Sequence, residues 1–334
     1  MYPLLGKAAS LSCCPTREAT SALLEEHAGE APLRDIWARW LLHDRHGGDV
    51  VHEQSLRAQV DRYADRVIDG LCLAEGMTLL DVGTGDGLVA FRAIERVGAS
   101  LNVVLTDVSA ELIRYAETRA LARGVASQCR FVAGSAEHLH DIADASVDAL
   151  AMRAVLAYVH DKRAALGQAL RVLKPGGRLS FAEPILQDDA LNAIALRRIT
   201  DSDGESEHHS VMRLLHRWKS AQFPDTPEAL ASNPLVNYSE RDLLAWVQDA
   251  GFRDIHMELH VSVRRSEGIP WRTFLASAPH PLAPTLEHVL GERFDEAERR
   301  EFERLLRPAV EAGVDNEVER QVYLTAGKPP GSPS

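Results

Sequence analysis

A glycine-rich turn is the feature of this sequence that points most directly to chemistry. Gly83, Gly85 and Gly87 alternate in L-L-D-V-G-T-G-D-G-L, residues 79–88, and Asp81 comes just before them. Glycines let the backbone turn sharply and approach a ligand closely at a helix N-terminus. The spacing is G-x-G-x-G, whereas the dinucleotide fingerprint is G-x-G-x-x-G. The turn therefore predicts a cofactor site rather than a plain strand-to-helix connection.

A second acidic residue, Asp107, ends an apolar run in V-V-L-T-D-V-S. A carboxylate at the end of a strand can accept hydrogen bonds from both hydroxyls of a ribose. Helix capping is the other role for an acid at this point, but Ser109 is the better N-cap for the following helix. We therefore expect Asp107 to bind the sugar of a nucleoside cofactor.

Four further polar residues follow predicted strands at the same edge of the sheet. Arg153 could hold a carboxylate through a bidentate contact, or pair with a neighbouring acid. Glu183 could act as a general base or hold a substrate amine, or it could bond to a loop. Tyr158 and His160 could reach a substrate, although such residues also pack or cap helices. These four are the candidate catalytic residues.

Other residues could complete a pocket. The segment R-H-G-G-D, residues 45–49, could fold over a cofactor, and Tyr63 could touch it. Candidates for lining a substrate pocket are His208, His209, His216 and Trp218. Trp218 also stands at helical spacing from Leu214 and Leu215, which favours a core position.

Two patterns in the sequence could suggest metal binding or thiol chemistry. His256, Glu258 and His260 form H-x-E-x-H, not the zinc-binding H-E-x-x-H, and they alternate with apolar residues. They indicate a solvated strand face whose apolar neighbours are buried, so no metal-binding residues are expected. The four cysteines, Cys13, Cys14, Cys72 and Cys129, form neither a C-x-x-C pair nor a secreted disulfide pattern.

The elements that must position these residues follow from apolar periodicity. Strands are predicted at 78–82, 101–106, 130–133, 147–152 and 178–183, with helices at 88–97, 110–123 and 161–173 between them. A helix at 53–71 precedes them, and a helix at 240–250, a strand at 254–263 and a last strand at 321–326 follow. Such alternation predicts a parallel sheet with both faces covered.

Two stretches, 185–235 and 264–318, depart from the alternation and carry helical patterns. Ligands of open α/β sheets bind at the carboxyl ends of the strands, so helical insertions there usually form a cap over a pocket. The predicted divisions are a helical segment 1–52, a core 53–184, a cap 185–238, a core helix and strand 239–263, a second insertion 264–318, a core strand 319–328 and a disordered tail 329–334.

Composition limits the class of protein. The chain has 334 residues, 45% of them hydrophobic, and a net charge of −12. This is ordinary for a globular protein, and the negative field disfavours DNA or RNA as a partner. No signal peptide and no membrane span are predicted, which together with the scattered cysteines makes the cytoplasm the expected location.

The motifs together resemble the class I S-adenosylmethionine-dependent methyltransferases, in the small-molecule branch that includes UbiE-like and arsenite-methyltransferase-like enzymes. The resemblance covers residues 53–183 and 239–263. Asp81–Gly87 is similar to the family's first motif D-x-G-x-G-x-G, and Phe131–Leu139 is similar to its adenine segment. Arg171–Leu179 resembles the usual run into the fifth strand. Ser135 followed by Ala136 stands where many relatives have Asp-Ala, which leaves the adenine contacts less defined than the ribose contact.

The resemblance implies an α/β fold: a Rossmann-like seven-stranded, mostly parallel sheet with helices on both faces, an antiparallel last strand, and helical cap insertions. The cofactor is S-adenosylmethionine, with S-adenosylhomocysteine as product. The implied cofactor-binding residues are Asp81, Gly83, Thr84, Gly85, Gly87, Asp107, Val108, Ser135, Ala136 and Arg153.

The expected function is methyl transfer to a small organic acceptor in an enclosed pocket, without nucleic acid or membrane partners and with a homodimer left open. Three alternatives stay open. The first is thiolate-dependent arsenite methylation, which would need Cys13 and Cys14 to fold over the site. The second is an NAD-dependent oxidoreductase, since an acid such as Asp107 serves both cofactors. The third is a non-catalytic S-adenosylmethionine-binding protein.

Overall fold

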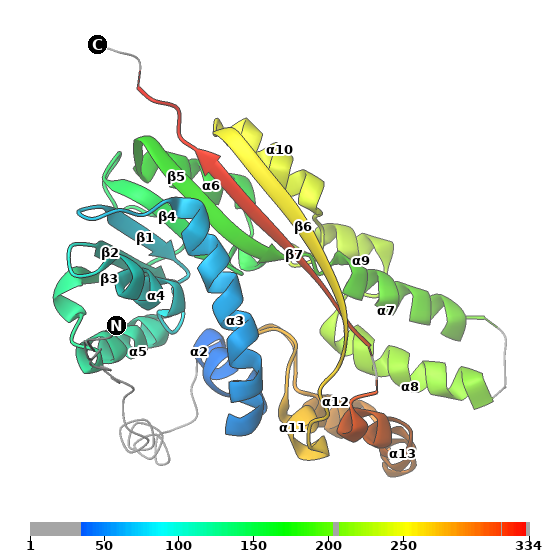
Figure 1. Ribbon diagram of the computed structural model, residues 1–334. Coiled ribbons are helices and arrows are strands. Elements are labelled where there is room, and N and C mark those ends of the chain that lie inside the picture. The colour runs from blue at the N-terminus through cyan, green and yellow to red at the C-terminus, as the bar shows by residue number, and fades with distance from the viewer. Residues whose placement is uncertain (1–34, 203–206, 315, 332–334) are drawn as a thin grey trace, which may run out of the picture. The chain divides into compact units, whose positions relative to one another are not determined.

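Seven strands form one sheet in the order β3-β2-β1-β4-β5-β7-β6. The computed structural model describes residues 35–202, 207–314 and 316–331 (Figure 1). The strands are β1 (Thr78–Val82), β2 (Asn102–Asp107), β3 (Cys129–Ala133), β4 (Val147–Arg153), β5 (Leu173–Pro184), β6 (Arg253–Arg265) and β7 (Asn316–Gly327). β3, β2, β1, β4 and β5 pair in parallel, and β7 is antiparallel to both of its neighbours. The predicted fold class is confirmed.

Helices join the strands and flank the sheet. Those of the strand-helix alternation are α3 (Val50–Leu71), α4 (Leu88–Val97), α5 (Ala110–Ala122), α6 (Lys162–Val172) and α10 (Glu240–Ala250), with short 3-10 turns η2 (Ala126–Gln128) and η3 (Leu156–Tyr158). Side-chain caps fix where several begin. Ser109 accepts a hydrogen bond from the Leu112 amide at 3.0 Å at the start of α5, as predicted. Asp49 caps α3, which therefore begins three residues earlier than the predicted residue 53.

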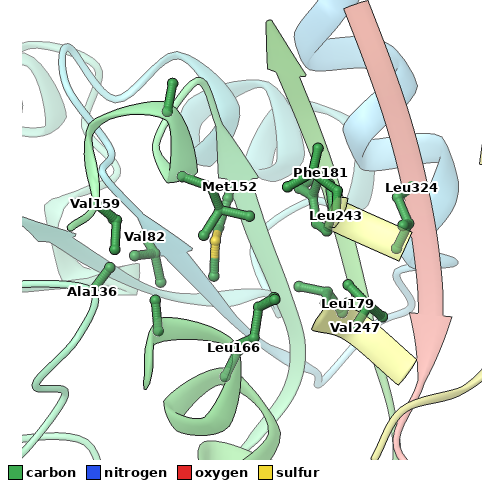
Figure 2. Packing of buried hydrophobic residues seen from close by; sticks show 14 of the residues in the cluster. Val82, Ala136, Met152, Val159, Leu166, Leu179, Phe181, Leu243, Val247 and Leu324 are labelled. Carbon is green, nitrogen blue, oxygen red and sulfur yellow. The ribbon is translucent and has the colours of Figure 1, made fainter. Parts of the chain in front are cut away.

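Apolar side chains alternate along the strands and so fill a core on each face of the sheet. On one face Val82, Met152 and Phe181 pack with Leu166 of α6 and Leu243 of α10 (Figure 2). On the other face, buried residues of α3, α4 and α5 cover Leu79, Leu105 and Ala151. The central strands are therefore buried on both faces, which leaves their carboxyl ends as the place where a ligand can enter.

Further helices occupy the two stretches that depart from the alternation. They are α7 (Gln187–Thr200), α8 (Glu207–Gln222), α9 (Pro227–Ser232), α11 (Trp271–Ala276), α12 (Leu286–Arg293) and α13 (Glu296–Ala312). A third apolar cluster joins α8 to α11, α12 and α13 through Leu214, Trp271, Leu290 and Phe302. In Figure 1 the β6-β7 edge runs down toward α11, α12 and α13.

The expected N-terminal helical segment is described only from Asp35 onward. It contains α2 (Ile36–Arg39) followed by a π-helical turn η1 (Trp40–Asp44). Cys13 and Cys14 lie outside the described residues, and so do the last three residues of the predicted tail. β5 begins at Leu173 rather than 178, because Leu173 pairs with Val147 before a register shift in the ladder.

Candidate functional site

A cavity of about 580 Å³ lies at the carboxyl ends of the parallel strands. Loops that follow β1, β2, β3 and β4 form one side of it. The predicted site residues that line it are Asp81, Gly83, Thr84, Gly85, Asp107, Val108, Ser135, Ala136, Arg153, Tyr158 and His160. The structure thus brings together, in one cavity, residues predicted from separate motifs.

The glycine turn after β1 has the backbone shape that its sequence predicts. Gly83 has φ +64°, and a Cβ at that position would come within 2.5 Å of Val155 Cγ2. Any larger residue would therefore strain the turn and press on the loop after β4. The Thr84 amide donates to the Thr106 carbonyl at 2.9 Å, which ties the turn to β2. Gly87 does not line the cavity; it is the N-cap residue of α4, with φ +79°.

Asp81, at the end of β1, holds this turn through hydrogen bonds. Its carboxylate is 1% exposed and accepts hydrogen bonds from Thr84 Oγ1 at 2.7 Å and the Ala90 amide at 3.2 Å. Burial raises the pKa of Asp81 to about 7, against the lowering effect of these two hydrogen bonds. One acid thereby joins the end of β1, the turn and α4.

Asp107 ends β2 beside the turn. Its Oδ2 accepts from the Gly85 amide and its Oδ1 from the Ser109 amide, both at 2.9 Å. Burial raises its pKa, and the two backbone amides oppose that shift. Each carboxylate oxygen keeps acceptor capacity after these bonds, so the side chain is held rigidly and can still accept from a ligand.

The loop after β3 and the loop after β4 complete this side. Ser135 Oγ accepts from the Glu137 amide at 3.2 Å, and Glu137 accepts from the Asp161 amide at 2.6 Å. Tyr158 packs edge-on against Trp37, with ring centroids 5.3 Å apart. Burial raises the pKa of Tyr158, and so does the nearby Glu183 carboxylate, so the phenol stays protonated at neutral pH.

Glu183 requires a correction. The sequence leaves it either a catalytic carboxylate facing the cavity or a bond to a loop, and the structure contradicts the first role, because Glu183 is fully buried and does not line the cavity. Oε1 accepts from the amides of Val155 at 2.9 Å and Leu156 at 3.0 Å, and Oε2 accepts from Ala157 at 3.2 Å. Burial raises its pKa to about 7. Glu183 thus holds the loop after β4 that carries cavity residues, instead of meeting a substrate.

The four pocket candidates on α8 also lie elsewhere. His208, His209, His216 and Trp218 are absent from the cavity lining. His216 pairs with Asp225 at 2.8 Å, and Trp218 packs edge-on against Phe274 and Phe302 in the α8 cluster. The core position that helical spacing favours for Trp218 is confirmed.

The metal and thiol patterns take no part in this cavity. Glu258 joins His256, His260 and the Arg66 guanidinium on β6, and among the described residues no group of three acids, histidines or cysteines is placed to hold a metal. Leu259 and Val261 are 42% and 52% exposed, so the expectation that they fill a buried face was wrong. β6 is an edge strand with little to cover it. Cys72 is exposed, and neither it nor Cys129 lines the cavity.

The rest of the cavity lining comes from residues far apart in the sequence. Tyr63 and Arg45, both considered from sequence, line it, together with Trp37, Trp40, Leu41, Leu56, Pro184, Leu186, Ala278, Pro279, Pro281, Glu319 and Gln321. Sequence reasoning missed most of this second group. The aromatic pair in W-A-R-W, residues 37–40, and the proline-rich segment 278–284 were the available signals.

Hydrogen bonds fasten residues 40–49 to residues 273–278, and we call these two segments the strap. Trp40 Nε1 donates to the Ala278 carbonyl at 2.9 Å, and the Ala278 amide donates to the Asp44 carbonyl at 2.8 Å. Thr273 Oγ1 donates to Asp49 at 2.7 Å. The strap lines part of the cavity and reaches the glycine turn, where Leu41 Cδ2 would lie 3.0 Å from a Cβ on Gly85.

Comparison with known proteins matches the part of the chain that carries the strand loops of the cavity. A family model described as a methyltransferase domain matches residues 73–230. The ubiquinone/menaquinone biosynthesis C-methyltransferase UbiE of Brucella anthropi is 40% identical over 111 residues, which is 32% of this chain and 42% of that protein. Residues 73–230 are therefore a methyltransferase domain, and the chain is similar there to S-adenosylmethionine-dependent methyltransferases.

The matches to curated methyltransferases cover only part of each protein. UbiE of Idiomarina loihiensis is 36% identical over 121 residues, 35% of this chain and 48% of that protein. The chain therefore spans less than half the length of these curated relatives. The YcgJ protein of Bacillus subtilis shares the fold, with TM-score 0.51 and 16% identity over 81% of this chain and 99% of that one. In the part of the chain that the structure describes, no helix is long and apolar enough to cross a membrane.

Proposed function

We propose that the protein transfers the methyl group of S-adenosylmethionine to a small organic acceptor bound in the same cavity. The observation that carries the proposal is that one cavity is lined both by the strand loops of the methyltransferase domain and by the strap. Its volume of about 580 Å³ lies within the usual range for small-molecule sites.

The residues on the strand-loop side fit the donor. Asp107 would accept from the ribose hydroxyls, Ser135 and Ala136 would border the adenine, and Arg153 would hold the donor's carboxylate. The glycine turn leaves space that a Cβ at Gly83 would fill. We call this side the donor half and the side with the strap the acceptor half.

Bound donor supplies an activated methyl on a sulfonium, so the protein's part is alignment and exclusion of water. In the transfer the S–C bond would break with its electron pair left on sulfur as the acceptor atom bonds to the methyl carbon, and any proton on that atom would pass to solvent. Trp37, Trp40 and Leu41 present apolar surface for this purpose. Positioning of this kind accounts for up to about 7 to 11 kcal/mol of a reaction barrier.

Arsenite as acceptor is less favoured by the described residues. Cys72 and Cys129 lie away from the cavity, and burial raises the pKa of the Cys129 thiol to about 11, which keeps it protonated. That function now depends on Cys13 and Cys14 alone. The relatives are named for carbon methylation in quinone biosynthesis, but the strap residues lie outside the matched range 73–230. Their acceptor is therefore not transferred to this protein.

Calorimetric titration with S-adenosylmethionine, S-adenosylhomocysteine and NAD tests the proposal. We expect micromolar binding of the first two and none of NAD. Tight NAD binding would support an oxidoreductase instead. Binding of the donor without consumption of it in the presence of any organic acceptor from a broad screen would favour the non-catalytic alternative.

A further inference from the structure

Arg45 is a cation of the acceptor half with no partner of its own. It lines the cavity from the turn between η1 and α3, and its guanidinium carbon lies 5.6 Å from the Trp40 ring centroid. Among the residues that the structure describes, no hydrogen bond or ion pair involves this guanidinium. Burial, and then the nearby Arg153 charge, lower the pKa of Arg45 to about 10 against the opposing charge of Asp86, so Arg45 is still protonated at neutral pH.

The acids that line the same cavity have other close partners. Asp86 pairs with Arg119 at 2.5 Å, Glu319 accepts from Gln59 at 2.7 Å, Glu137 accepts from the Asp161 amide at 2.6 Å, and Asp81 and Asp107 accept from the groups described above. A partly buried cation beside a second one is costly when nothing neutralises it. A bound anion would remove that cost.

The donor cannot satisfy both arginines by itself, because it carries a single carboxylate. Arg153 ends β4 beside the loop that a Cβ at Gly83 would strike, and its charge partly opposes the burial that raises the pKa of Asp81, the acid that holds the glycine turn. It is therefore the arginine of the donor half. Arg45 stands instead with Trp40 and the strap, and the two tyrosines near it, Tyr63 and Tyr158, stay neutral.

We propose that Arg45 binds a carboxylate of the methyl acceptor, so that the acceptor is a small and mainly apolar organic acid. This inference rests on the proposed function. The apolar surface beside Arg45 is that of Trp37, Trp40, Leu41 and Pro281. A carboxylate held by a guanidinium is a poor nucleophile, so the methyl group goes to another atom of the acceptor.

The strap holds Arg45 in place before any ligand binds. The Arg45 amide donates to the Trp40 carbonyl at 2.8 Å, and the Gly48 amide donates to the His43 carbonyl at 3.0 Å. The next residue back, Asp44, is bound to Ala278 of the other strap segment at 2.8 Å. These bonds fix the backbone that carries Arg45, so less of the chain must be ordered when an anion binds, which favours affinity.

Ligand-observed NMR on the protein saturated with S-adenosylhomocysteine tests this role. The probes are benzoate, 4-hydroxybenzoate, phenylacetate, cinnamate and hexanoate, each beside its primary amide, together with phenyl phosphate. We expect at least one acid to bind about ten-fold more tightly than its amide, as for a charge-assisted bidentate contact. Arg45→Gln should abolish this preference and Arg45→Lys should keep part of it.

A matched control separates the local effect from general electrostatics. Arg163 on α6 forms an exposed ion pair with Asp249 on α10, and neither residue lines the cavity. Arg163→Gln should therefore keep the full preference for acids. Calorimetry should give the same S-adenosylhomocysteine affinity for wild type and Arg45→Gln. Because Arg45 has no ion pair to lose, Arg45→Gln should melt at or above the wild-type temperature.

Several results would overturn the inference. Equal binding of acids and amides, binding of no acid in the panel, or a stronger response to phenyl phosphate than to the acids would each remove the carboxylate assignment. A ten-fold loss of S-adenosylhomocysteine affinity in Arg45→Gln would place Arg45 on the donor's own carboxylate. Failure of the wild type to bind S-adenosylhomocysteine is a distinct result, because it would refute the proposed function itself.

Discussion

The donor half and the acceptor half of the cavity are built in different ways. The donor half consists of loops that follow neighbouring parallel strands, and contacts such as Gly85 to Asp107 join consecutive strand-helix units. The acceptor half joins segments more than 200 residues apart, as in the bond from Trp40 to Ala278. The comparison teaches that the fold itself forms the proposed donor half, whereas the proposed acceptor half depends on how distant segments meet.

The two halves also differ in how far the matched methyltransferase domain covers their residues. The methyltransferase domain model covers residues 73–230 and so includes the glycine turn, Asp107 and Arg153. Trp37, Arg45 and the segment 278–281 lie outside it. Substitutions that affect donor and acceptor binding separately are therefore the sharpest tests of this division.

The largest expected effect belongs to the donor half. Asp107→Ala should weaken S-adenosylhomocysteine binding by about 2 to 5 kcal/mol, because charge-assisted hydrogen bonds to the ribose are lost. Calorimetry would measure it, with Asp249→Ala at an exposed ion pair as the control. Unchanged affinity in Asp107→Ala would remove the ribose assignment.

A pH effect is expected at Glu183, beneath the loop after β4. Burial raises its folded-state pKa from 4.5 to about 7, so the folded protein holds this proton more tightly than the unfolded chain. This contribution to the free energy of unfolding is full below pH 4.5 and is lost as the pH rises through 7, a change of about 3 kcal/mol. Urea unfolding across this range should show a shallower decline for Glu183→Gln than for wild type.

A parallel decline in both proteins would contradict this account of Glu183. Asp81 contributes in the same direction, because burial also raises its pKa to about 7, so part of the decline should persist in Glu183→Gln. Asp249→Asn, at an exposed site, should leave the wild-type profile unchanged.

The strap should affect the acceptor half alone. Thr273 is 1% exposed and donates to Asp49, so Thr273→Val should loosen the strap by removing that hydrogen bond, with a small loss of overall stability because water can reach Asp49. We expect weaker binding of the aryl acids and no change in S-adenosylhomocysteine affinity. Thr118→Val, on the exposed face of α5, is the matched control. Equal losses of both ligands would show that the two halves are not separable.

The smallest effect is expected from the cysteines. Ser substitutions at Cys13, Cys14, Cys72 and Cys129 together should leave S-adenosylhomocysteine affinity unchanged, and wild type should not consume donor with arsenite and a thiol. Mass spectrometry of the reaction mixture would detect methylated arsenic. Its formation by wild type and its absence from the quadruple variant would restore the arsenite function.

The features that the sequence predicts lie mainly in the donor half, and those that it misses lie mainly in the acceptor half. α4 begins and ends at its predicted residues, 88 and 97, because a glycine turn and Gly98 delimit an apolar periodic run. Cavity residues such as Asp107 were found because their local motifs place them at strand ends. For Glu183 the sequence leaves a catalytic carboxylate and a bond to a loop as alternatives, because its partners are backbone amides 26 to 28 residues away. Trp37 and Pro279 carry no local motif, and only tertiary packing shows that they share a cavity.

The most direct test of the two-half cavity is a crystal structure of the complex with S-adenosylhomocysteine. We predict ribose hydroxyls within hydrogen-bond distance of Asp107, adenine beside Ser135 and Ala136, the amino-acid carboxylate at Arg153, and open space between the product's sulfur and Arg45. A nucleoside bound elsewhere, or a product carboxylate held by Arg45, would contradict the account.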